Sequence, residues 1–407
     1  MFTGKTLENY CLLSLKKGVN IQKGQGLVII CPTEHRKLAL QMTKTAYKLG
    51  AKIVEIRWED EEILRQTYLN AQTETLINVP KWFVDSKNFL VKENYCYVAI
   101  NGDDPQAFYG LDENKIAKVI KAKSEKLKAF NDAVMSNKIR WCVNPVPTKK
   151  WARKVFPHSK NSLFSLQKAI ERTMRLDLPN PVEAWDKHIE KLESRAKFLN
   201  DNQFSYLHFE SSNGTDIMVG LAKQHIWTAA KEKSADGIDF IANMPTEEIF
   251  TSPHKDKVDG VVKSALPLSY NGQIIDRFSL TFKRGKVVDF SAEIGYDVLK
   301  NLLRTDKGVS RLGEVALIGK NSPIAKENIL FYNTLFDENA SCHFALGKAY
   351  PTTVKAPDNK RSSLSELGLN DSAMHIDFMI GTKDTKITGI KKDNTSISIF
   401  DNGEWLI

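Results

Sequence analysis

Apolar runs rich in β-branched residues alternate with longer amphipathic stretches over the first half of the chain. The stretch 34–49 repeats its apolar positions at helical spacing and stops before Gly50, so it predicts a helix. Strands are predicted on either side of it and further along, at 26–31, 52–58, 95–100 and 140–143. This alternation predicts a mainly parallel sheet covered by helices.

The pattern changes after Leu178-Pro-Asn-Pro181, where a helix-like segment at 182–199 leads into shorter apolar runs. Strands are predicted at 206–209, 216–219, 261–270, 273–283 and 286–294, with turns at Ser212-Asn-Gly214, Asn271-Gly272 and Arg284-Gly285. An Asn-Gly pair between alternating apolar residues is a strong hairpin signal. The second half is therefore expected to be strand-rich and antiparallel, with helices at 296–303 and from about 339.

These elements predict an α/β fold of two domains, which a chain of 407 residues is long enough to form. A parallel-sheet α/β domain at 1–185 is expected to precede a strand-rich α+β domain at 186–407. Gly24-Gln25-Gly26 precedes its predicted strand instead of following it, so it does not form a phosphate-binding loop.

Composition favours a folded cytoplasmic protein. Hydrophobic residues make up 42% and charged residues 26% of the chain, which excludes a disordered protein. No apolar run reaches the roughly 18–20 residues of a membrane helix, and residues 1–17 lack the apolar core of a signal peptide. Without such a run we expect no membrane partner. The five cysteines are scattered and odd in number, so we expect reduced thiols.

The net charge of +9 raises the alternative of a polyanion-binding protein. Residues 1–200 contain 34 Lys and Arg against 22 Asp and Glu, whereas residues 201–407 contain 24 against 27. The excess of basic residues is therefore confined to the first half. Its densest run, 115–128, has apolar residues between the lysines, as on the solvated face of a helix. We therefore expect no nucleic-acid partner.

Acidic and histidine residues in the second half gather in four short segments with apolar neighbours, surroundings that isolated charges avoid. In the first, an extended chain would place Glu248 on the face of Phe250 and Glu247 on the other, although two solvated carboxylates would fit as well. In the second, Glu314 opens a predicted buried strand. A buried carboxylate there requires a cation or several hydrogen-bond donors, and Arg311 offers a simple salt bridge as the alternative.

The third segment predicts a helix between Asn339 as its cap and Gly347 as its end. His343 would lie in the middle of that helix, where a satisfied core histidine is the alternative interpretation. Glu338 would precede the helix, off the face that His343 occupies. Cys342 is badly placed for activation by His343, because helix neighbours point about 100° apart.

In the fourth segment, His375 and Asp377 share one face of a predicted strand, a spacing that also occurs by chance. Together the segments offer a mixed nitrogen and oxygen ligand set that suits a pair of divalent ions, Zn or Co, with Mg or Mn as further options. Two close ions can activate water and polarise a carbonyl, so the set indicates hydrolysis. The candidate ligands are Glu248, Glu314, Glu338, His343, His375 and Asp377.

In these segments the sequence resembles the aminopeptidase T and aminopeptidase S family of metallo-aminopeptidases. The shared motifs are Met-Pro-Thr-Glu247-Glu248, Arg311-Leu-Gly-Glu314-Val-Ala-Leu, Phe331-Tyr-Asn-Thr-Leu-Phe-Asp-Glu338-Asn-Ala, His343 with Tyr350, and His375-Ile-Asp377. The resemblance is clearest over residues 240–381, and no equally diagnostic motif occurs in the first half.

The resemblance implies a broad-specificity, cobalt- or zinc-activated aminopeptidase that acts as a homodimer on peptides with a free amino terminus. It also implies that 186–407 is the metal-binding catalytic domain, with its site in an enclosed cavity. Glu314 matches the bridging ligand, and Tyr350 matches a tyrosine beside the metals that could donate to an oxyanion. Glu338 and Glu247 are both candidates for relaying the proton. A dipeptidase that uses the same ions is the nearest alternative.

Overall fold

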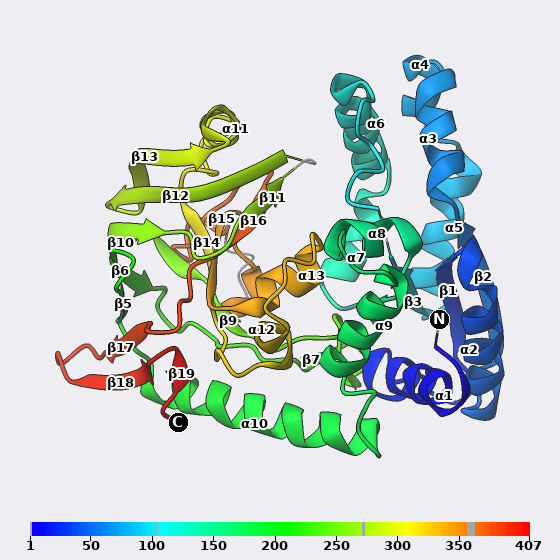
Figure 1. The fold of residues 1–407 in the computed structure, drawn as a ribbon, viewed down its shortest axis with the longest axis horizontal. Helices are drawn as coiled ribbons and strands as arrows, with labels where there is room; N and C mark the ends of the chain where they lie inside the picture. Colours follow the sequence, from blue (N-terminus) through cyan, green and yellow to red (C-terminus); the bar gives the residue numbers. More distant parts are fainter. Residues whose placement is uncertain (1, 103, 271–272, 356–362) are drawn as a thin grey trace. The chain divides into compact units, whose positions relative to one another are not determined.

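The computed structural model describes residues 2–102, 104–270, 273–355 and 363–407 (Figure 1). The chain divides into two compact units, Met1–His188 with Lys231–Pro245, and Ile189–Ala230 with Thr246–Ile407. The predicted domains were 1–185 and 186–407, so they do not anticipate the return of Lys231–Pro245 to the first unit. The long helix α10 (Pro181–Asn202) begins in the first unit and ends in the second.

The first unit contains the predicted parallel sheet, with strand order β2-β1-β3-β4. Its strands are β1 (Gly26–Pro32), β2 (Ile53–Glu59), β3 (Cys96–Asn101) and β4 (Trp141–Pro145). The central strand β1 carries β-branched residues and is buried on both faces over most of its length. The unit also contains helices α1 to α9: Gly4–Leu13, Arg36–Lys48, Glu61–Asn70, Thr73–Ile77, Lys81–Lys92, Glu113–Lys126, Lys128–Met135, Lys149–Val155 and Ser162–Thr173.

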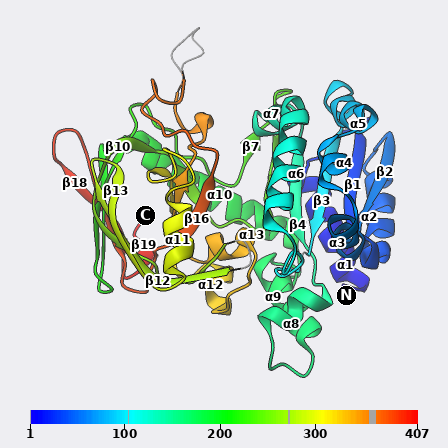
Figure 2. The same cartoon turned by 90° about the horizontal axis from the view of Figure 1, so that it is seen from above.

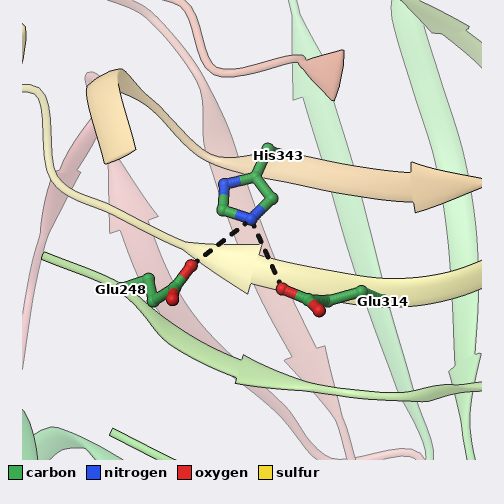
Figure 3. A group of neighbouring side chains, drawn as sticks. All are labelled: Glu248, Glu314 and His343. Carbon is green, nitrogen blue, oxygen red and sulfur yellow. Dashed lines mark ion pairs between the residues drawn. The ribbon is translucent and has the colours of Figure 1, made fainter. Parts of the chain in front are cut away.

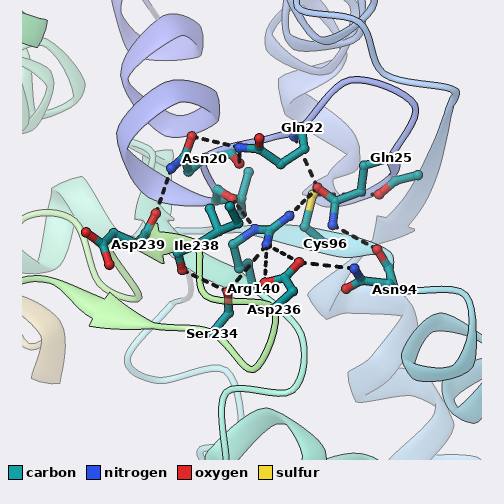
Figure 4. A network of polar contacts seen from close by, with 12 residues as sticks. Asn20, Gln22, Gln25, Asn94, Cys96, Arg140, Ser234, Asp236, Ile238 and Asp239 are labelled. Atoms are coloured by element: carbon teal, nitrogen blue, oxygen red, sulfur yellow. Dashed lines mark hydrogen bonds and ion pairs between the residues drawn. The ribbon is translucent and has the colours of Figure 1, made fainter.

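A buried arginine holds the returning segment within the first unit (Figure 4). Arg140 is only 1% exposed, and its guanidinium donates to Asp236 at 2.7 Å, to Gln25 Oε1 at 2.6 Å and to the Val19 carbonyl at 3.1 Å. Asp236 lies in the turn between the short strands β7 (Glu232–Lys233) and β8 (Asp239–Phe240). The chain thus passes into the second unit and back before the metal-binding segments begin.

The second unit contains a nine-stranded antiparallel sheet and a smaller four-stranded one (Figures 1 and 2). The large sheet has the order β11-β12-β10-β6-β5-β17-β18-β19. The ninth strand, β13, lies outside this order and pairs with β12. Its strands are β5 (Tyr206–Ser211), β6 (Thr215–Leu221), β10 (Pro253–Lys263), β11 (Leu268–Tyr270), β12 (Gln273–Lys283), β13 (Lys286–Ile294), β17 (Lys386–Ile390), β18 (Ser396–Asp401) and β19 (Glu404–Trp405).

The small sheet has the order β16-β15-β14-β9 and is antiparallel throughout. Its strands are β9 (Ile249–Thr251), β14 (Leu312–Leu317), β15 (His343–Gly347) and β16 (His375–Met379). Aromatic side chains from one of its faces pack on the large sheet, with ring centroids 5.0 Å apart for Phe209 and Phe344 and 5.6 Å apart for Phe278 and Phe378. The other face is free to carry polar side chains.

Short helices connect these strands: α11 (Tyr296–Leu302), α12 (Pro323–Glu327), α13 (Thr334–Asp337), and the 3-10 turns Glu338–Ala340 and Pro351–Thr353. The fold-class prediction is confirmed, because a parallel α/β sheet precedes a strand-rich antiparallel region. The predicted strand 261–270 is wrong in extent, since β10 ends at Lys263 and β11 begins at Leu268. The predicted turn Asn271-Gly272 lies outside the described residues. Within the described part of the chain, no helix has the length and apolarity to cross a bilayer.

Candidate metal centre

Glu314 reaches the polar face of the small sheet because of a β-bulge at Gly313. Leu312 pairs with Leu346 and Glu314 with Ala345, so β14 has one residue more than β15 at this point. In a regular strand Glu314 would point to the same side as Leu312, which is in the hydrophobic core. The extra residue of the bulge reverses the alternation of side chains from that point on, so Glu314 points to the polar face and Val315 points into the core.

The strand register places the remaining ligand candidates beside Glu314. Ala345 pairs with Asp377, Gly347 pairs with His375, and His343 lies two residues before Ala345 on the same face of β15. The residues between the polar side chains are small, so nothing bulky separates Glu314 from Asp377. Phe344 points to the opposite face and packs in the core.

The polar side chains form two groups that share Glu314. Glu248, Glu314 and His343 offer one set of ligand atoms and Glu314, His375 and Asp377 a second, with the atoms of each set within 4.8 Å of one another. His343 Nε2 lies 3.5 Å from Glu248 Oε2 and 3.4 Å from Glu314 Oε1 (Figure 3). His375 Nε2 lies 3.5 Å from Glu314 Oε2 and 3.3 Å from Asp377 Oδ1. Each carboxylate oxygen of Glu314 therefore faces a different histidine.

Backbone carbonyls orient both imidazoles. His375 Nδ1 donates to the Lys348 carbonyl at 2.7 Å, and His343 Nδ1 lies 3.4 Å from the Ser341 carbonyl. Because Nδ1 donates to a carbonyl, Nε2 is the nitrogen that would bind a cation after losing its own proton, and Nε2 is the atom that faces the carboxylates. Metal-binding histidines commonly have this arrangement.

Burial and mutual repulsion perturb the ionisation of the carboxylates. Burial, and the charges of Glu314 and Asp377, raise the pKa of Glu248 to about 8, although His343 opposes the shift. Burial also raises the pKa of Glu338 well above its ordinary value, and the charges of Asp377, Glu248 and Glu314 add to it. The pKa of Asp377 is lowered, because the charge of His375 and its hydrogen bond outweigh the effect of burial.

The pKa values of both histidines are raised, as expected for imidazoles surrounded by carboxylates. Burial lowers the pKa of His343, but the hydrogen bond to Glu314 and the charges of Glu248 and Asp377 raise it to about 9. Burial likewise lowers the pKa of His375, and the charge of Asp377 and the hydrogen bond to it raise the value to about 10. Without a cation, the cluster therefore retains protons at neutral pH.

These properties fit divalent metal ions. Four buried or half-buried carboxylates would together carry four negative charges, which two divalent ions would balance. Asp377 Oδ1 is buried, and among the described residues its contact with His375 Nε2 at 3.3 Å does not have the geometry of a hydrogen bond, so a lone pair is available to a cation. Imidazole and carboxylate together suit Zn, Co and Mn.

Glu338 and Tyr350 lie at the margin of the two groups. Glu338 belongs to neither of them, but with Asp377 it lines a cavity of about 60 Å³. The Tyr350 ring contacts His375 with centroids 5.0 Å apart, and burial together with the nearby carboxylates raises its pKa. Sequence patterns did not single out Asp337, which lines the same cavity and accepts hydrogen bonds from Phe331 N and Asn333 N.

Several expectations about these residues were wrong. His343 lies on a strand instead of a helix, and Asn339 is part of a 3-10 turn, where its Oδ1 accepts a hydrogen bond from Glu247 N at 2.8 Å. The strand β15 is buried on both faces, so its sequence lacks the alternation that marks a half-buried strand. Glu247 is 6% exposed and Glu248 is partly buried, which excludes two solvated carboxylates.

Arg311 is not the partner of Glu314. Its guanidinium binds Asp256 Oδ1 at 2.8 Å and the Lys255 carbonyl at 2.6 Å. The salt-bridge alternative for Glu314 is therefore wrong.

Fold and site together define a class of protein, an α/β chain of two units with a buried carboxylate and histidine centre suited to metal. A family model described as thermophilic metalloprotease (M29) matches residues 3–405. The chain is 41% identical over 402 residues to aminopeptidase AmpS of Bacillus subtilis and 41% identical over 404 residues to aminopeptidase 2 of Geobacillus stearothermophilus, with 98% of each chain covered. The structure of wild-type AmpT from Thermus thermophilus matches with a TM-score of 0.92 at 33% identity, covering 99% of both chains.

The chain belongs to this M29 family of metalloproteases. It is a metal-dependent hydrolase of peptide bonds, and the resemblance stated from its motifs is confirmed.

Proposed function

We propose that this protein is an aminopeptidase of broad specificity whose catalytic centre, in 186–407, holds two divalent ions. The observation that carries the proposal is that Glu314 belongs to both ligand groups, each of which has its own histidine and a second carboxylate. Such a shared carboxylate suits a bridging ligand. Two ions bound there would activate water and polarise the scissile carbonyl.

Glu338 is proposed to carry the proton in this reaction, in addition to its expected role as a ligand. Burial and the charge of Asp377 raise the pKa of this carboxyl group, which makes its carboxylate a stronger proton acceptor than an exposed glutamate, and with Asp377 it lines the cavity. It can therefore accept a proton from the attacking water and return it to the leaving amine. Glu247, the other candidate, is not among the residues that line the cavity.

Tyr350 is proposed to stabilise the oxyanion that develops on the carbonyl. Its raised pKa keeps the phenol protonated, so the hydroxyl is a hydrogen-bond donor. The ring lies between Phe250 and His375, with centroid distances of 5.7 and 5.0 Å. These two contacts fix the orientation of the ring beside the ligand groups.

The cavity beside the centre, with a volume of about 60 Å³, is proposed to receive the amino group of the first residue of the peptide. Asp337 and Glu338 supply acidic groups that favour a cationic amino terminus, and Leu268 and Met379 supply apolar surface. A cavity of this size that binds the amino group leaves the side chain of the first residue outside it, which is compatible with broad specificity.

The decisive experiment combines metal removal with blocked substrates. The protein reconstituted with Zn, Co, Mn or Mg is expected to cleave leucyl-p-nitroanilide and to shorten peptides from the amino terminus, and EDTA treatment is expected to abolish both. Acetylated peptides of the same sequence are expected to resist cleavage. Equal rates with and without metal, or with and without the acetyl group, would refute the proposal. Cleavage of dipeptides alone would favour the dipeptidase alternative.

In the polyanion-binding alternative, the acid and histidine segments would be structural ion pairs. Membership of the metalloprotease family favours catalysis instead.

We further propose that the enzyme is a cytoplasmic homodimer. The resemblance motivates the dimer, and five free cysteines, all buried, are compatible with a reducing compartment. Light scattering of the purified protein at twice the chain mass of 46.0 kDa would support the dimer, and a monomer would refute it.

A further inference from the structure

A second concave site lies in the same unit as the metal centre but on different elements. It is a groove of about 770 Å³ between β13, the end of α11 and the segment that leads to β14, a size within the usual range of ligand sites. Apolar side chains contribute part of its surface, among them Val287, Phe290 and Leu303. Figure 1 shows β13 at the margin of the large sheet, with α11 beside it.

The groove carries an uncompensated positive charge. None of its four cations Lys286, Lys300, Arg304 and Lys307 forms an ion pair with the described residues. A fifth, Arg311, is paired with Asp256 at 2.8 Å.

The one acidic residue of the lining, Asp306, forms no ion pair with these cations in the described part of the chain and offsets only one of their charges. Its Oδ1 accepts hydrogen bonds from Gly308 N at 2.7 Å and Val309 N at 2.8 Å, and its Oδ2 accepts from Ser372 Oγ and Ala373 N, both at 2.8 Å. The groove therefore presents four free cations to a ligand, although the second half of the chain has more acidic than basic residues.

The backbone beside these cations is also available. β13 has only β12 as a strand neighbour within the described residues, so its other edge is that of an outer strand. Val287 N is satisfied by the Ser310 carbonyl at 2.9 Å, but the strand continues to Ile294, and Val288 is 58% exposed. An outer strand with exposed apolar residues is a template for the addition of an extended peptide.

We propose that this groove binds an extended acidic peptide segment, which pairs with the edge of β13 while its carboxylates contact Lys286, Lys300, Arg304 and Lys307. The apolar surface and the strand edge favour a peptide over a nucleic acid. Phe290, the one aromatic residue of the lining, is already stacked on Tyr296 with centroids 5.2 Å apart, so no free ring is present for a base. The groove is a binding site separate from the catalytic centre, and the inference does not depend on the proposed function.

The test is fluorescence anisotropy with the metal-loaded full-length protein. The probe is a labelled, acetylated eight-residue peptide that alternates Glu and Val, which an aminopeptidase cannot degrade. The double variant Lys300→Gln/Arg304→Gln is expected to bind it about fivefold more weakly, since each exposed ion pair contributes roughly 0.5 kcal/mol. The matched variant Lys223→Gln/Lys392→Gln removes the same charge from the same unit outside the groove and is expected to bind as the wild type does.

Binding is also expected to weaken between about 50 and 300 mM salt, because the pairs are exposed to solvent. Circular dichroism and cleavage of leucyl-p-nitroanilide should be unchanged in both variants, which separates loss of the groove from loss of the fold or the catalytic centre. The inference is wrong if the wild type does not bind the probe, if both double variants bind equally, or if a Gln-for-Glu peptide binds as well. Tighter binding of an oligonucleotide of equal charge at the same cations would also overturn it.

Discussion

Gly313 forms the bulge that turns Glu314 out of the hydrophobic core and toward His343 and His375. A β-carbon at Gly313 would lie 2.4 Å from the Lys348 carbonyl oxygen and 2.5 Å from that of Gly347. Both neighbours are backbone atoms, which cannot move as a side chain could. The position of the shared ligand therefore depends on a residue that has no functional group.

Gly313→Ala is expected to lower the metal content and the stability together. Overpacking against backbone costs about 1–3 kcal/mol, and relief of the clash would move Glu314. Metal analysis and thermal unfolding of the purified variant measure both effects. Gly319→Ala, beyond the other end of β14, meets mainly the flexible carboxylate of Glu404 and should retain the metal. A Gly313→Ala protein with full metal content would contradict this account of the bulge.

Replacement of Glu314 should remove more bound metal than replacement of any other ligand. Glu314→Ala is expected to lose both ions because its two oxygens belong to both groups, whereas Glu248→Ala and Asp377→Ala each disrupt one group. Metal per chain, measured by mass spectrometry after gel filtration, should fall from two to none in the first variant and to about one in the others. Equal losses in all three variants would argue against a bridging role.

Metal uptake should release protons. The raised pKa values of Glu248, His343 and His375, about 8, 9 and 10, mean that the metal-free cluster carries protons at pH 7. An ion must displace them, so the apparent metal affinity should rise with pH between 6 and 8. Calorimetric titrations in buffers of different ionisation enthalpy count the released protons. Uptake without proton release would show that the ligands are already deprotonated.

Acid should destabilise the first unit through His35. The residue is 4% exposed, its Nε2 makes no hydrogen bond within the described residues and lies 4.0 Å from Glu34 Oε1, and burial lowers its pKa to about 4. Because the unfolded chain binds the proton at about pH 6.5, this contribution to stability is complete above pH 6.5 and is lost as the pH falls toward 4, by at most about 1.4 kcal/mol per pH unit.

His35→Leu should therefore lose less stability than the wild type between pH 7 and 5, as measured by urea unfolding. His158→Leu, a change at an exposed site, should follow the wild type. Parallel curves for His35→Leu and the wild type would exclude His35 as the origin of the acid sensitivity.

Arg140→Met should destabilise the first unit by about 3 kcal/mol. The change removes the guanidinium donor from the Val19 carbonyl and from Gln25 Oε1, which retains only Gln22 N, and it removes the ion-pair partner of Asp236. Limited proteolysis should then cleave near 231–245 at lower denaturant concentration than in the wild type. Lys23→Met, at an exposed site in the same unit, is the matched control and should leave cleavage unchanged.

The sequence by itself determined the class of fold, because hydrophobic periodicity and turn residues are local properties. The strands β1 to β4, the hairpins β5–β6 and β12–β13, and the placement of His375 and Asp377 on one strand all follow from such patterns. It also marked Glu314, since a carboxylate at the start of an apolar run has a burial cost that is visible without coordinates.

Tertiary structure decided which strands pair, in what register, and toward which face their side chains point. His343 lies on a strand because β14 and β16 pair with its segment from both sides, and a strand buried on both faces has lost its alternation. The same pairing fixed the bulge at Gly313, and hence the direction of Glu314 and its division between two histidines. The return of Lys231–Pro245 to the first unit likewise depends on Arg140, about a hundred residues earlier. Register and long-range pairing are collective properties of the sheet, so only the folded chain specifies them.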